Sequence, residues 1–227
     1  MITEIINGCG CCGESVDTFS ALNFEYLGTN GGRVFLHTDS NYHYNWSGNQ
    51  SNNKFFDELL KKISNNTMIG SFQPLQNDAF SFPLDAVDYN ISISNIYNYN
   101  TIIVGHKQNA CSSNEEYTYP KNLLSYVDIF KNYVLDGNNL FVMGEHSRCQ
   151  DLIINQFLGA IGCSMYQNKL VAEGGYEYLY VTAEGAYFGF PLKISSALVS
   201  RIYNGIPLYR LGNIQIPTTT TTTTTSL

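Results

Sequence analysis

The feature that most constrains the fold of this chain is an alternation of short, apolar, β-prone runs with longer segments of helical periodicity. The runs RVFLHTD, TMIGSFQ, NTIIVGHK and NLFVMG each predict a buried strand. Apolar residues recur at helical spacing in NKFFDELLKKIS, in the segment opened by Pro120, and in DLIINQFLGAIG. Thr101 to Val104 are all β-branched, which indicates burial on both faces of a sheet. The alternation predicts an α/β fold of three layers, α/β/α, with a mainly parallel sheet.

Glycines and a proline set the expected bounds of the helices. Pro120 fits the first turn of the second helix, Asp136-Gly137 is expected to end it, and Gly162 is expected to end the third. Beyond Gly162 the sequences YEYLYVT, AYFGF and PLYRLG predict strands. Residues 191–205 fit either a helix or a covering loop.

One domain is expected, with a distinct segment at each end. The α/β domain is assigned to residues 33–216, after a Gly/Cys-rich segment and lead-in at 1–32 and before a poly-Thr tail or linker at 217–227. The first segment holds three close cysteines, Cys9, Cys11 and Cys12. These are candidates for a thiolate metal site, for cross-links to another chain, or for a flexible reduced tail. We expect the two end segments to contact other protein subunits, and we expect no cofactor.

The charge balance excludes some partners. The chain has 12 Lys and Arg against 19 Asp and Glu, a net charge of −7, and no basic patch that would bind nucleic acid. It has no apolar run of the ~18 residues that a membrane span needs, and its first residues do not form a Sec signal peptide. A charged fraction of only 14%, with abundant Asn and 17 Tyr, suits an extracellular or virion-associated protein.

Titratable side chains follow three of the expected strands. Asp39 follows the first strand, His106 follows NTIIVG, and Glu145 and His146 follow NLFVMG. Because sites in parallel sheets form at the carboxyl ends of strands, these four are candidate catalytic residues for acid–base or metal-assisted chemistry. The alternative is structural, since polar strand-end residues often only cap the next helix.

A second group of candidates could bind a ligand without chemistry. Tyr42, Tyr44 and Trp46 lie in one polar loop, where their rings could stack on a sugar or a partner, or fold back on one another. Ser147, after the GEH turn, is a further ligand-binding candidate. His37 lies inside the first strand and is predicted to be packed there.

The series NTIIVGHK, helix, LDGNNLFVMGEHS, helix, LGAIG resembles the class I glutamine amidotransferase-like superfamily, whose architecture is flavodoxin-like. It is most similar to an uncharacterised branch in which a D-G-G-x-L-x-x-x-G-E-x-S phrase ends the strand before the elbow. The resemblance covers about residues 33–165. It implies the fold of that superfamily.

The same resemblance argues against amidotransferase activity. The elbow of catalytic members reads G-x-C-x-G, and the matching GEHSR has His146 at the nucleophile and Arg148 at the second glycine. No histidine follows residue 146 to serve as the later catalytic base. The chain therefore resembles a degenerate branch that lacks the nucleophile.

Two functions are expected from these features, and the first is favoured. One is a non-catalytic α/β interaction module of an extracellular or virion-type assembly, which binds a partner chain or a glycan. The other is a hydrolase or lyase that uses the strand-end Asp, His and Glu residues, with or without a metal. A flavodoxin-like cofactor binder is the least favoured, because the loop after the first strand has no Gly-rich dinucleotide fingerprint.

Overall fold

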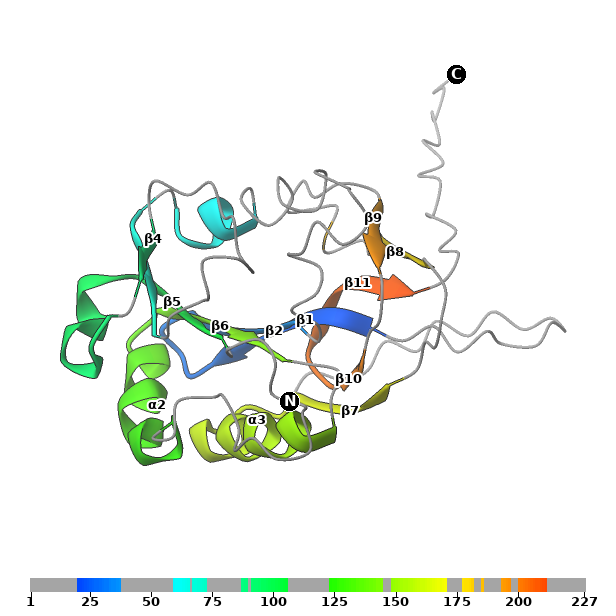
Figure 1. Ribbon diagram of the computed structural model, residues 1–227. Coiled ribbons are helices and arrows are strands. Elements are labelled where there is room, and N and C mark those ends of the chain that lie inside the picture. The colour runs from blue at the N-terminus through cyan, green and yellow to red at the C-terminus, as the bar shows by residue number, and fades with distance from the viewer. Residues whose placement is uncertain are drawn as a thin grey trace, which may run out of the picture.

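The computed structural model describes residues 20–37, 59–65, 67–72, 87–89, 91–105, 123–144, 148–170, 177–181, 185, 193–196 and 200–211. These residues form one mixed sheet with helices on both of its faces (Figure 1). The α/β prediction is confirmed. Within the described residues, no helix combines the length and the apolar character that a membrane crossing needs.

The strands, in chain order, are β1 (Ser20–Leu27), β2 (Gly32–His37), β3 (Ile69–Ser71), β4 (Val87–Tyr89), β5 (Thr101–Val104), β6 (Asn139–Met143), β7 (Tyr166–Leu170), β8 (Glu177–Val181), β9 (Lys193–Ser196), β10 (Ser200–Tyr203) and β11 (Ile206–Leu211). The helices are η3 (Ile93–Asn98), η4 (Leu123–Tyr126), α2 (Val127–Leu135) and α3 (Arg148–Ile161), and residues 59–63 are also helical.

The sheet has a parallel half and an antiparallel half. Its main order is β4-β3-β5-β6-β2-β1-β11-β8-β9, with β10 pairing to β1 and β7. The strands from β4 to β2 are parallel, whereas β1, β11, β8 and β9 pair antiparallel in turn. The strands β2, β3, β5 and β6 of the parallel half match the sequence prediction, whereas β4 was not predicted. In the antiparallel half, β8 and β11 correspond to the predicted strands YEYLYVT and PLYRLG, and the predicted strand AYFGF lies outside the described residues. The remaining antiparallel strands were not predicted, and β1 comes from the segment assigned as a lead-in.

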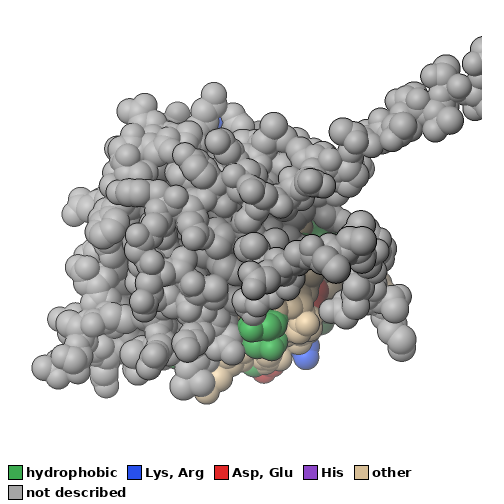
Figure 2. Space-filling model, turned by 90° about the vertical axis from the view of Figure 1, so that its right-hand side faces the viewer, with side chains coloured by type: hydrophobic (Ala, Val, Ile, Leu, Met, Phe, Trp, Pro, Cys, Tyr) green, Lys and Arg blue, Asp and Glu red, His purple; other side chains and the backbone are tan. Residues whose placement is uncertain are grey.

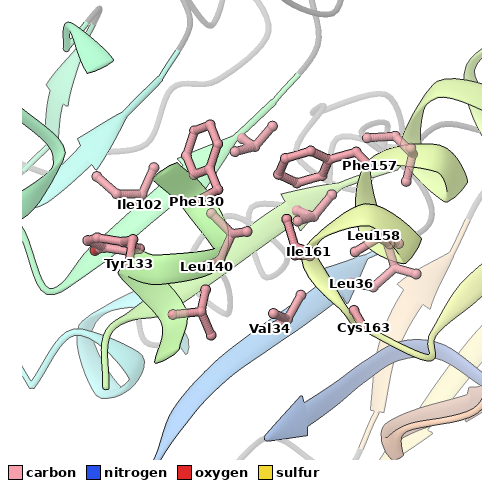
Figure 3. Close-up of a cluster of buried hydrophobic side chains, with 14 of the residues drawn as sticks. Val34, Leu36, Ile102, Phe130, Tyr133, Leu140, Phe157, Leu158, Ile161 and Cys163 are labelled. Carbon is pink, nitrogen blue, oxygen red and sulfur yellow. The ribbon is translucent and has the colours of Figure 1, made fainter. Parts of the chain in front are cut away.

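Alternate side chains of the parallel strands face two different layers. Val34, Ile102 and Leu140 point toward α2 and α3, where they join a buried cluster with Phe130 and Phe157 (Figure 3). The opposite face meets the helix at residues 59–63, because the Nδ2 of Asn139 donates to the carbonyl oxygen of Ile63 at 3.0 Å. The three layers expected from the sequence are therefore present. Burial on both faces explains why these strands are continuously apolar.

Two segments differ from the sequence expectation for local reasons. Residues 191–205 include β9 and β10, so the helical alternative was wrong. Asn204 and Gly205 turn the chain into β11 with φ of 61° and 73°, which Asn and Gly tolerate best. The segment after Pro120, where apolar residues recur at helical spacing, begins its described part as the 3-10 turn η4, and its Leu124 is 44% exposed. The helix ends at Asp136 and Gly137 as predicted.

Gly32 provides a test of how tightly β2 is packed against the end of α2. A Cβ at this position would lie 1.8 Å from the carbonyl oxygen of Val134, which is backbone and cannot rotate away. We expect Gly32→Ala to lower the free energy of unfolding by about 3 kcal/mol in urea titrations. The control is Gly159→Ala in α3, where a Cβ meets nothing within 4 Å. That change should leave stability unchanged or raise it by roughly 0.5–1 kcal/mol, and equal losses in both variants would contradict the packing.

Candidate functional site

The candidate site lies at the carboxyl ends of three neighbouring strands. β5, β6 and β2 are consecutive in the sheet and parallel, with Val104 opposite Val142 and His37 opposite Met143. These are the strands after which the sequence analysis found titratable residues. The sequence could place these three strand ends only on the same side of the sheet. The structure shows that the three strands are neighbours.

The predicted site residues themselves lie outside the described residues. They are Asp39, His106, Glu145, His146, Ser147, Tyr42, Tyr44, Trp46, Cys9, Cys11 and Cys12. What the structure describes is the frame from which these residues extend.

The described helices that next follow β2 and β6 in the chain pack on opposite faces of the sheet. After β2 the chain reaches the helix at residues 59–63, on the face where Asn139 contacts Ile63. After β6 it reaches α3, which packs on the other face (Figure 1). Adjacent parallel strands whose connections diverge in this way define the position at which open α/β sheets bind ligands. The β2–β6 boundary is therefore where a site in this part of the sheet is expected.

His37, the last residue of β2, is packed as the sequence analysis predicted. Its side chain is fully buried, and its ring lies 6.5 Å from that of Phe141 with 20° between the planes. A buried imidazole costs free energy when it is charged. His37 therefore packs in the interior of the sheet, where solvent does not reach its side chain.

A side chain at the position of Gly144, which follows β6, would displace the buried end of the Gln167 side chain. The N–H of Gly144 donates to the carbonyl oxygen of His37 at 2.6 Å. A Cβ here would lie 2.1 Å from the Oε1 of Gln167. The glycine before the GEHS turn is required because the fully buried Gln167 side chain lies directly against it.

Asn155 of α3 holds Gln167 in this place. The Nδ2 of Asn155 donates to the carbonyl oxygen of Gln167 at 2.7 Å, and its Oδ1 accepts from the N–H of Gln167 at 2.9 Å. The sequence analysis missed both residues. No local signal singles out Asn155, because the exposed Gln156 is also an amide between the inward-facing Ile154 and Phe157.

A second polar contact fixes the turn between α3 and β7. One oxygen of Glu25, on β1, accepts from the N–H and Oγ of Ser164 at 2.9 Å each and from the N–H of Met165 at 3.2 Å. The Sγ of Cys163 donates to the same oxygen at 3.4 Å. Burial, and next the nearby carboxylate, raise the pKa of the Cys163 thiol, so it stays protonated.

The described frame offers hydrogen bonding and no reactive group. β2, β5 and β6 lead into the site with His37, Gly105 and Gly144, and all three are buried. Across the described part of the chain, no three His, Cys, Asp or Glu side chains are grouped so that they could hold a metal ion. Any chemistry at this edge would have to come from the residues that follow these strands.

Comparison of the chain with protein-family models, curated proteins and solved structures gives no match.

The contact between Asn155 and Gln167 can be tested by shortening the amide. We expect Asn155→Ala to lower the free energy of unfolding by about 2 kcal/mol, because two backbone groups of β7 lose their partner. Asn155→Asp keeps the acceptor and loses the donor, so it should also destabilise. The matched control is Gln156→Ala, at the exposed neighbouring position, which should stay within about 0.5 kcal/mol of the wild type. Equal effects at the two positions in urea titrations would contradict the role of Asn155.

The raised pKa of Cys163 predicts an unreactive thiol. In a variant that keeps Cys163 and carries Ser at the other cysteines, we expect Ellman's reagent at pH 8 to react at least ~100-fold more slowly with the folded protein than with the same chain in guanidinium chloride. The direction follows from the pKa, since a higher value leaves less thiolate at pH 8. Rapid reaction in native buffer would show that the thiol is accessible and ionised.

Proposed function

We propose that this chain is a non-catalytic α/β binding module, which acts in an extracellular or virion-borne assembly by contacting a partner chain or a glycan. The observation that carries the proposal is how the described polar groups at the strand ends are used. His37 is fully buried against Phe141, and Gln167 is fully buried against Gly144. In a working active site such groups would be turned toward substrate, whereas here both side chains are closed to solvent.

The assembly context of the proposal rests on the sequence. A net charge of −7 disfavours nucleic acid as the partner, while Cys9, Cys11 and Cys12 and the threonine run after Pro217 provide two end segments suited to contacts with other subunits. The GEHSR elbow, with His146 where the related enzymes carry a cysteine, supports the loss of amidotransferase chemistry.

We also propose that the parallel half belongs to the flavodoxin-like type. That fold has the strand order 2-1-3-4-5. The order β4-β3-β5-β6-β2 matches it when β3 is counted as the first strand and β2 as the fifth. In this chain β2 occupies the fifth position but comes first in sequence among these five strands. The sheet would therefore be a rearranged member of the type.

A hydrolase or lyase is the second candidate, and one observation favours it. The described helices that next follow the neighbouring strands β2 and β6 pack on opposite faces of the sheet, and Asp39, Glu145 and His146 follow these two strands. Their side chains would have to converge for this function.

The two candidates are separated by the double variant Glu145→Gln/His146→Asn. We expect the wild-type protein to turn over none of a panel of nitrophenyl esters, phosphates and glycosides above a mock-purified blank, with or without added Mn²⁺ or Zn²⁺. The control is His43→Asn, which removes a histidine that is not among the candidate catalytic residues. Turnover that survives His43→Asn and is lost in the double variant would establish the enzyme and overturn the binding module.

A further inference from the structure

Two tyrosines form a stacked, partly exposed aromatic pair on the ribbon of β7 and β10. Tyr166 and Tyr203 lie directly opposite each other in the antiparallel pairing. Their rings are stacked, with centroids 4.9 Å apart and only 7° between the planes. Tyr166 is 39% exposed although it carries a large apolar ring. The neighbouring residues Met165 and Ile202 point the other way, into the core, so the ring pair lies on the outer side of the ribbon.

Contacts from three strands hold this surface in place. The Nδ2 of Asn204, next to Tyr203, donates to the carbonyl oxygen of Ser164 at 2.9 Å. The carbonyl oxygen of Asn204 accepts from the Nδ2 of Asn23 on β1 at 2.7 Å. Glu25, also on β1, fixes Ser164 and Met165 from the other side. The rings are therefore preorganised, which reduces the entropy lost when a ligand binds.

Polar groups lie beside the rings. Ser164 and Asn204 are exposed and Glu25 is half-buried. All the described hydrogen bonds to the Glu25 carboxylate use one oxygen, Oε2. A hydroxyl, an amide and a carboxylate thus belong to a hydrogen-bonded group that adjoins the aromatic pair in the chain. This combination suits a ligand with one apolar face and a rim of hydroxyl groups.

We propose that the Tyr166–Tyr203 surface binds a neutral carbohydrate, whose ring stacks on Tyr166 while its hydroxyls bond to Asn204, Ser164 and Glu25. The inference rests on the proposed binding module and names its ligand class. The carboxylate of Glu25 and the net charge of −7 act against sulfated, phosphorylated and nucleic-acid ligands. In Figure 1 the β7–β10 ribbon lies at the lower right. On that side of the molecule, Figure 2 shows a small group of hydrophobic side chains beside uncharged, acidic and basic residues.

The small size of the surface favours a sugar over a protein partner. Stable protein interfaces cover roughly 800 Å² on each partner, which is far more than two partly exposed rings and three polar side chains provide. One sugar ring, in contrast, is matched in area by a single exposed aromatic face.

The test uses the full chain in native affinity gels that contain one neutral polysaccharide each: mannan, xylan, mixed-linkage β-glucan, galactan or amylopectin. We expect at least one of them to slow the wild-type protein. Tyr166→Ala and Tyr203→Ala should bind that polysaccharide roughly tenfold more weakly, because a stacking surface is lost. Tyr166→Phe keeps the ring and should stay within about threefold of the wild type.

The matched control is Tyr26→Ala. Tyr26 is 49% exposed on β1 and packs edge-on against Phe24, away from the ring pair. It should leave the binding unchanged. Thermal melts check that each variant is folded, and Tyr166→Ala alone decides the result if Tyr203→Ala does not fold.

Two outcomes would overturn the proposal, and they differ from a failure of the proposed function. If a polysaccharide binds the wild type and Tyr166→Ala equally, the binding module stands but this surface is not its site. If none of the neutral polysaccharides is bound, the surface does not bind neutral sugars. Turnover of substrates, measured separately, is what would overturn the binding module itself.

Discussion

β2 is the strand on which the rest of the sheet depends, because it pairs in parallel with β6 on one side and antiparallel with β1 on the other. β2 therefore joins the parallel half of the sheet to the antiparallel half. Val34, Phe35 and Leu36 are almost completely buried, so both faces of the strand lie in the interior. A shift of one residue would exchange its two faces and move His37 from the side of Phe141 into the opposite layer. The register of this one strand therefore determines the core, the antiparallel half and the frame of the candidate site.

Hydrogen bonds at the amino-terminal ends of the parallel strands fix the register of β2. The Nε of Arg33 donates to the Oδ1 of Asn139 at 3.0 Å, and the Nδ2 of Asn139 donates to Ile63 and, at 3.4 Å, to the Oγ1 of Thr101. These contacts join the first residues of β5 and β6 to the second residue of β2 and to the helix above them. The two ends of the parallel strands thus have different roles. Polar side chains align the strands at their amino-terminal ends, and the candidate site is placed at their carboxyl-terminal ends.

The sequence predicted the parallel half well, because β2, β3, β5 and β6 are buried on both faces and carry little besides apolar residues. β1 was missed since it mixes buried residues with the exposed Tyr26 and the half-buried Glu25, and it follows a segment of unusual composition. The sequence could also predict that polar residues follow β2, β5 and β6. It could not give their adjacency, which depends on a strand order that brings the first of these three beside the last. The roles of Gln167 and Asn155, and the stacking of Tyr166 on Tyr203, arise from pairings between distant segments, for which no local pattern exists.

The contact between Asn155 and β7 has a consequence for how copies of this protein meet. In the described residues β7 pairs with β10 alone, so its other side would present unpaired backbone groups. Such a strand is a template for pairing with another chain, and natural proteins block it in specific ways. The amide of Asn155 presents one donor and one acceptor to Gln167, as a neighbouring strand would. Within the described residues, a single side chain of α3 thus occupies the backbone groups of Gln167 that another strand would need, which disfavours edge-to-edge pairing at this position.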